Sequence, residues 1–108
     1  MEYTFKIKYD KEYYHELREI YLYIKHRLKE EKIARKEIRK IMEKIKVLET
    51  FPRAFKLFRK EKDFEYRKFI IKNYVIIYKI NLKEKEVNIL HIYNQKQKIK
   101  NKKEYSEV

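Results

Sequence analysis

Cysteine and glycine are both absent from this sequence of 108 residues, and proline occurs only once. Without cysteine, the chain can form no disulfide, thiolate nucleophile or cysteine-based zinc site. Without glycine, it has none of the glycine-rich loops that cradle phosphates. No window approaches the ~20 apolar residues of a membrane span, and the start, MEYTFKIKYD, lacks the apolar stretch of a signal peptide. We therefore expect a cytoplasmic protein that needs no cofactor and no metal.

Positive charge is the strongest signal in the composition. The chain has 30 Lys and Arg against 17 Asp and Glu, a net charge of +13, and residues 51–108 carry +9 of that charge. Such a field attracts polyanions, so nucleic acid, a ribosomal surface, an anionic membrane and an acidic protein all fit as partners. The length fits one domain. We expect it over residues 1–108, with a polar basic tail from about residue 95 that is a flexible end or a docking helix.

The first half of the chain predicts one strand and two helices. Residues 3–9 alternate between apolar and polar side chains, which is typical of a half-buried strand. Apolar residues then recur at helical spacing over residues 11–29, after an N-cap at Asp10. A second helical stripe follows and ends near Glu49, because Pro52 disfavours helix in the residue before it.

The second half predicts a connector and three strands. Residues 53–65 are basic and aromatic, and we interpret them as a connector. Apolar strands follow at 66–71, 74–80 and 87–93, the first two joined by a tight Lys72-Asn73 turn and the second central in the sheet. The predicted fold is α+β with the order β-α-α-β-β-β: a helical hairpin packed on a mainly antiparallel four-stranded sheet.

This order and three local segments resemble the RelE/ParE family of bacterial toxins from toxin–antitoxin pairs. The first segment, LETFPRAF, ends the second helix. The second, YRKFIIKNYVIIYKI, has a basic residue entering a strand, then Asn-Tyr, an apolar run and a second Tyr. The third, VNILHIYNQKQ, is a final strand with an internal polar residue and a basic segment after it. The resemblance covers about residues 3–98.

The resemblance implies a toxin but leaves its target open. Some family members cut messenger RNA on the ribosome without a metal, and others bind DNA gyrase with no known nuclease chemistry. We expect ribosome-dependent RNA cleavage ahead of gyrase inhibition, and a non-toxic basic RNA- or ribosome-binding module is a further alternative. Both toxin functions imply an acidic antitoxin with an amphipathic helix and an extended arm. Complementary charge would hold it to this chain in a hetero-oligomer.

Arg67 is the first candidate for RNA cleavage. The reaction needs a base for the 2′-OH, a cation for the phosphorane and an acid for the leaving oxygen. Arg67 matches the family's arginine at the start of the second strand and would be the cation. The alternative is an arginine paired with a helix glutamate at the sheet rim. A two-residue Lys72-Asn73 turn would put Arg67 on the face of Tyr78, which is the expected helix-covered face. It would then reach a groove on the other face only from the strand end or through a bulge.

His91 is the second candidate, as a proton donor or a cation that titrates near neutral pH. Its spacing puts it on the face of Val87, Ile89 and Tyr93, and the alternative is a hydrogen-bonded structural histidine. Many ribonuclease members have an arginine at this point, and many have another where this chain has Val75. Two cations of the usual nuclease set are therefore missing.

The remaining candidates come from the connector and the tail. Lys60 and Lys62 would place phosphates or donate a proton, with a solvated loop as the alternative. Tyr105 matches a tyrosine near the end of some nuclease members. Five further cations are expected to contact nucleic acid: Arg53, Arg59, Lys68, Lys96 and Lys98.

Overall fold

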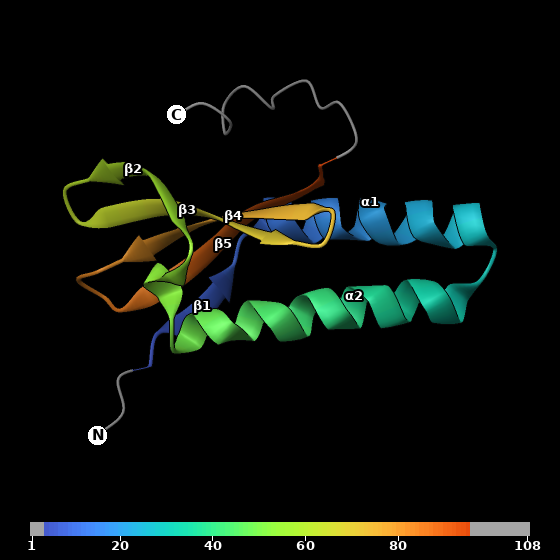
Figure 1. Cartoon of the computed structure of the whole chain (residues 1–108), viewed down its shortest axis with the longest axis horizontal. Coiled ribbons are helices and arrows are strands. Elements are labelled where there is room, and N and C mark those ends of the chain that lie inside the picture. The colour runs from blue at the N-terminus through green and yellow to red at the C-terminus, as the bar shows by residue number, and fades with distance from the viewer. Residues whose placement is uncertain (1–3, 96–108) are drawn as a thin grey trace.

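The computed structural model describes residues 4–95 of the chain, in which two helices pack on one face of a mixed sheet (Figure 1). Strand β1 (Lys6–Tyr9) leads into α1 (Lys11–Leu28), and α2 (Glu31–Ile45) follows after a two-residue link. The predicted strand and helical hairpin are confirmed. Predicted site residues Lys96, Lys98 and Tyr105 lie outside the described residues.

The helix ends follow the sequence signals, with one exception. Asp10 is the N-cap of α1 as predicted, but its side chain makes no capping hydrogen bond. Its backbone carbonyl instead accepts from the amide of Tyr13 at 3.1 Å. After α2, two 3₁₀ turns, η1 (Lys46–Glu49) and η2 (Pro52–Ala54), lead the chain to the sheet.

The sheet has five strands rather than the four that the sequence predicted. After β1 come β2 (Lys56–Glu61), β3 (Phe64–Ile71), β4 (Tyr74–Asn81) and β5 (Glu86–Asn94). Their spatial order is β1-β5-β4-β3-β2. Strand β1 runs parallel to β5, and every other pair is antiparallel.

The strand that the sequence missed is β2, inside the segment interpreted as a connector. It pairs only with β3 at the sheet edge, and most of its side chains are exposed. The pairing shifts by one residue between Leu57 and Arg59, so Phe58 is an extra, bulged residue. An exposed strand with a bulge has no apolar alternation of period two, because neither face is buried continuously.

The core lies between the helices and the face of the sheet that they cover. Strand β4 is central, and its residues from Tyr74 to Tyr78 are all buried, as predicted. Tyr13 of α1 and Tyr78 of β4 are fully buried in this core. The Tyr78 hydroxyl donates to the carbonyl of Pro52 at 2.6 Å, which holds η2 against the sheet.

Lysines take the left-handed backbone positions of this glycine-free chain. Lys29, Lys72 and Lys85 have φ values of 51°, 55° and 56°. Lys29 follows α1, Lys72 lies in the two-residue turn between β3 and β4, and Lys85 precedes β5. Residues with a Cβ reach this region only at a cost, so each position stores a small strain.

Candidate functional site

The candidate site is the outer face of the sheet, meaning the face opposite α1 and α2. Lys68 and His91 both pair with Ile77, one from each neighbouring strand. Cross-strand partners point to the same face, and strands lie about 4.8 Å apart, so the backbones of Lys68 and His91 are about 10 Å apart. Ile77 between them is 1% exposed. The structure thus places two predicted site residues on either side of one apolar residue.

Aromatic rings accompany the cations of this face. The guanidinium of Arg59 lies 4.4 Å from the ring centre of Tyr66, and the Lys79 ammonium lies 4.7 Å from that of Phe64. Phe58 is also beside Tyr66, with ring centres 6.4 Å apart. Arg59 additionally pairs with Glu61 at 2.9 Å. Stacked cations and rings of this kind can bind bases and phosphates of a single-stranded nucleic acid.

Arg67 lies on the other face, where the helices are. It pairs with Tyr78 across the strands, as the parity of the Lys72-Asn73 turn predicted. Its guanidinium donates to Glu65 at 2.8 and 3.2 Å and to the carbonyls of Arg53 and Phe55 at 3.2 and 2.6 Å. Its side chain is 11% exposed. Arg67 therefore forms an ion pair, but with a glutamate of its own strand rather than of a helix.

Glu65, which was not among the predicted site residues, is the centre of this cluster. It is 3% exposed and also receives two hydrogen bonds from Arg53, at 2.7 and 3.1 Å. The Arg53 hydrogen bonds hold the pKa of Glu65 below its ordinary value, against the effect of burial, with Arg67 acting in the same direction. A carboxylate two residues before Arg67 shares its face, and that spacing was the available signal.

The connector lysines divide between the helix-covered face and the turn. Lys60 is the cross-strand partner of Glu65 and lies 3.9 Å from its carboxylate, at the edge of the buried cluster. Lys62 lies in the exposed turn between β2 and β3. Neither faces His91, so the structure does not bring these candidates together.

His91 lies on the outer face. Its predicted placement beside Val87 and Ile89 was wrong, although it does share a face with Tyr93 as predicted. The pairing with β4 shifts between Ile89 and His91, so Leu90 is an extra residue and the later side chains change face. The pairing of β5 with β1 ends at Ile89, so the edge of β5 beyond it is open to α1. Glu16 of α1 reaches His91 at this edge, where Nδ1 lies 3.1 and 3.2 Å from its two carboxylate oxygens.

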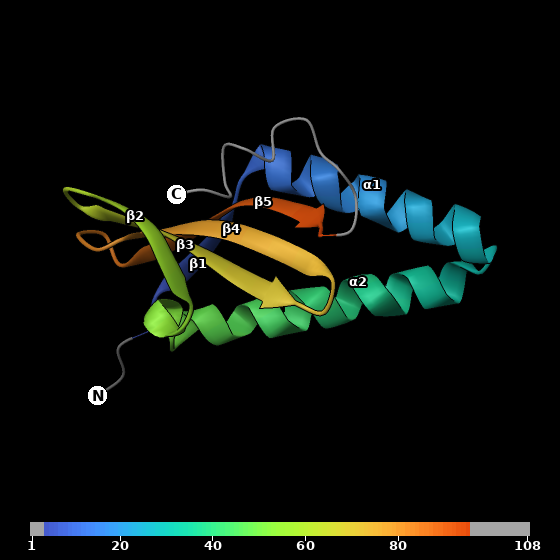
Figure 2. The ribbon, with the colours of Figure 1, turned by 45° about the horizontal axis from the view of Figure 1, so that its top comes forward.

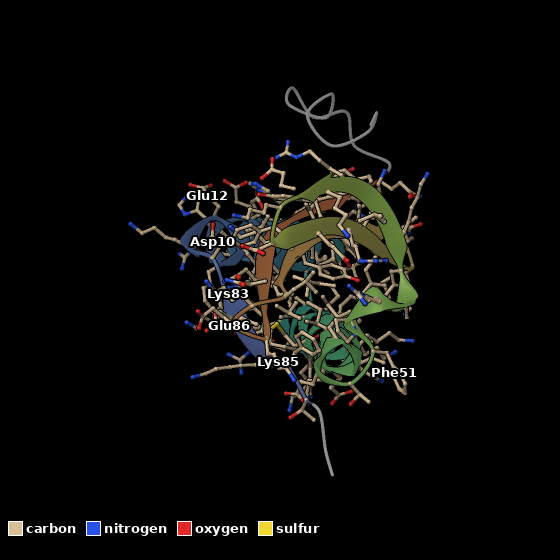
Figure 3. The ribbon with its side chains drawn as sticks, turned by 90° about the vertical axis from the view of Figure 1, so that its left-hand side faces the viewer. Asp10, Glu12, Phe51, Lys83, Lys85 and Glu86 are labelled. Atoms are coloured by element: carbon tan, nitrogen blue, oxygen red, sulfur yellow. The ribbon has the colours of Figure 1, made fainter. Side chains whose placement is uncertain are left out.

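Glu16 binds the edge of β5 as well as His91. Its carboxylate accepts the backbone amide of Ile92 at 3.0 Å. The hydrogen bond with Glu16 raises the pKa of His91 despite partial burial, and the charges of Glu12 and Asp10 add to the effect. Both acidic residues lie at the start of α1 (Figure 3). The surroundings of His91 are therefore acidic. Their negative charge weakens the attraction that a protonated His91 would exert on a phosphate.

The described residues were also searched for a metal site and for a membrane-spanning helix. Within residues 4–95, no three His, Asp or Glu side chains are grouped so that they could hold a metal ion. None of the helices in that range is long and apolar enough to span a membrane.

Comparison with known proteins identifies the protein family to which this chain belongs. Residues 7–99 match the family described as "ParE toxin of type II toxin-antitoxin system, parDE", so the chain belongs to this toxin family. No curated protein is significantly similar to the sequence.

Solved structures that share the fold include two from toxin–antitoxin systems. One is the archaeal RelE–RelB complex from Pyrococcus horikoshii OT3, with a TM-score of 0.65, 19% identity, and coverage of 88% of this chain and 99% of that one. The other is the chromosomal ParDE toxin–antitoxin system from P. aeruginosa, with a TM-score of 0.68, 19% identity, and coverage of 85% and 97%. The predicted RelE/ParE-like fold is confirmed.

Proposed function

We propose that this toxin acts by binding its target, and that the target is DNA gyrase, rather than by cutting messenger RNA. The observation that carries this proposal is the position of Arg67. Four of its hydrogen bonds go to Glu65 and to two backbone carbonyls on the helix-covered face. A cation held in this way is not directed at a phosphate on the outer face. Of the catalytic candidates within residues 4–95, only His91 lies on the outer face of a strand. Gyrase inhibition is thus placed ahead of ribosome-dependent RNA cleavage, the reverse of the order expected from the sequence.

Two assays run on the same purified, antitoxin-free toxin test the proposal. Plasmid supercoiling by gyrase should be lost as toxin is added, while toeprints of messenger RNA on translating ribosomes should show no new cuts. Arg67→Lys is the matched variant, because it keeps the charge and removes the two guanidinium hydrogen bonds to one oxygen of Glu65. New toeprint cuts together with undiminished supercoiling would overturn the proposal.

Ribosome-dependent RNA cleavage is the second candidate, and the outer face favours it. Lys68 and His91 flank Ile77, and Arg59 and Tyr66 lie in a stacked pair on the same face. A single strand of RNA could stack on the ring of Tyr66 and place its phosphates near Lys68 and His91. This candidate predicts that a Lys68→Ala, His91→Ala double variant stops cleavage without unfolding. The non-toxic module is set aside because the chain belongs to a toxin family.

We also propose an acidic antitoxin as the partner in a hetero-oligomer. The net charge of +13 favours rapid, salt-sensitive association with an acidic protein. The two similar structures are described as a RelE–RelB complex and a ParDE toxin–antitoxin system, which agrees with such a partner. The adjacent gene should encode a small acidic protein that restores growth when it is co-expressed, and an adjacent protein that fails to bind would refute the pairing.

A further inference from the structure

Exposed apolar side chains gather where α1 turns into α2. Tyr23, Leu28 and Ile33 are 49%, 45% and 46% exposed. They line a groove of about 450 Å³, which we call the hairpin-tip groove. Its other lining residues are Ile24, Arg27, Glu37, Asn73, Tyr74 and Asn94. None of the three exposed side chains belongs to the buried core, so folding alone does not explain why they are apolar.

The walls of the hairpin-tip groove are held in place by polar contacts. In the hairpin, Glu31 accepts hydrogen bonds from Tyr21 at 3.1 Å and from Arg35 at 2.6 Å, which ties α1 to α2. On the other side, Lys72 of the β3–β4 turn lies 3.6 Å from Glu37 of α2. Each exposed pair is worth little stability. They connect the elements that bound the groove, α1 to α2 and α2 to the β3–β4 turn.

The charge of the hairpin around the groove favours a protein with an acidic surface, although the groove lining itself holds one cation, Arg27, and one carboxylate, Glu37. Residues 23–37 carry six basic and three acidic side chains, a net charge of +3. A second copy of this chain would meet like charge there. A nucleic acid would satisfy the cations but would leave Leu28 and Ile33 uncovered. Apolar anchors beside tyrosine and arginine inside a charged rim are typical of protein–protein hot spots.

The hairpin tip projects from the body of the protein. Figures 1 and 2 show that both helices extend well past the end of the sheet. A projecting element can enter a recess in a larger protein without a clash from the sheet, whereas a wrapping inhibitor needs no projection. This geometry favours the inactivated protein over the antitoxin as the occupant.

We propose that the hairpin tip docks into an apolar recess with an acidic rim on the protein that this toxin inactivates. The inference rests on the proposed function, which is action by binding, and adds the surface that makes the contact. The outer face of the sheet then needs no catalytic group.

The test compares two sets of exposed apolar residues in the full-length chain. The tip variant carries Tyr23→Ser, Leu28→Ser and Ile33→Ser. The control carries Tyr14→Ser and Val47→Ser, which are 52% and 38% exposed and lie away from both the groove and the outer face of the sheet. Growth arrest on induction, gyrase supercoiling and binding to the co-expressed antitoxin are measured. The tip variant should need at least ten-fold more toxin for arrest and still bind the antitoxin, while the control should match wild type.

Charge reversal gives a second variant if the serines disturb folding. Lys25→Glu, Lys29→Glu and Lys32→Glu keep the apolar groove and remove the complementary charge. The variant should arrest growth less strongly than wild type, with the largest difference at low salt in the supercoiling assay.

The outcomes separate this inference from the proposed target. A tip variant as toxic as wild type would overturn the proposed docking surface. So would a tip variant that loses the antitoxin but keeps its toxicity, because the groove would then belong to the antitoxin. If wild type leaves gyrase active and the tip variant still loses toxicity, the docking surface stands and the proposed target falls.

Discussion

Replacing Glu65 by Gln removes the charge at the centre of the buried ion cluster and keeps its shape. Glu65 is 3% exposed and accepts from Arg53 and Arg67 through four contacts between 2.7 and 3.2 Å. In Glu65→Gln the two guanidinium groups lose their shared carboxylate. The side chain of Arg53 is 59% exposed and can return to water. Arg67 cannot, because its side chain is held between β3 and the η2 segment.

The size of the effect follows from this difference. Breaking a buried ion pair by removing one partner costs about 3–5 kcal/mol. Arg67 keeps its bonds to the carbonyls of Arg53 and Phe55, and Arg53 is hydrated again, so the loss should be smaller. We expect the free energy of unfolding to fall by about 2–3 kcal/mol, and 1 kcal/mol corresponds to roughly 4–8 °C in Tm for a domain of this size.

The same variant predicts a pH dependence. The native pKa of Glu65 is lowered, chiefly by hydrogen bonds from Arg53. A group with a lowered native pKa adds stability above its unfolded pKa, about 4.3 for glutamate, and this contribution is lost as the pH falls through the native value. The difference between wild type and Glu65→Gln should therefore be full at pH 7 and should shrink in acid.

Urea denaturation of wild type and two variants measures this difference. Glu61→Gln is the matched control, because Glu61 pairs with Arg59 at 2.9 Å but its side chain is 49% exposed. An exposed pair contributes about 0–1 kcal/mol, so the control should unfold close to wild type. If Glu65→Gln unfolds with the same midpoint as Glu61→Gln, the buried cluster does not stabilise the fold.

Three further predictions concern single positions. Lys29→Gly should raise the free energy of unfolding by about 1 kcal/mol, because glycine accepts the left-handed backbone that Lys29 adopts, and Lys29→Ala should show no such gain in thermal denaturation. The His91 pKa, followed by NMR, should lie above its ordinary value and fall in Glu16→Gln. The stability from this pair is present below the unfolded pKa of His91 and is lost as the pH rises through the raised native value. A His91 pKa that stays the same in Glu16→Gln would refute the contact. Tyr78→Phe should cost about 1–2 kcal/mol, since the buried carbonyl of Pro52 loses its donor, and an unchanged urea midpoint would contradict this.

The sequence predicted the elements whose burial is continuous. Both helices and β4 have regular apolar spacing, and the two-residue turn between β3 and β4 determines the face of Arg67 by parity alone. Bulges at Phe58 and Leu90 were not predictable, because one inserted residue breaks the alternation on which the strand prediction depends. The first hid β2, and the second put His91 on the wrong face. Glu65 was missed because its first partner, Arg53, reaches it only through the path of the η2 turn, which no local pattern in the sequence predicts.

The position of Arg67 changes how mutants of this toxin are to be interpreted. Arg67 links β3 to the η2 segment through Glu65 and two carbonyls, so its structural contacts alone account for an arginine at this position. Loss of toxicity in Arg67→Ala would therefore report unfolding as readily as lost chemistry. Lys68 lies on the opposite face from this cluster and shares the outer face with His91, so its removal should leave the fold intact. A Lys68→Ala variant that stays folded and toxic would argue against cleavage, whereas a folded, non-toxic one would favour it.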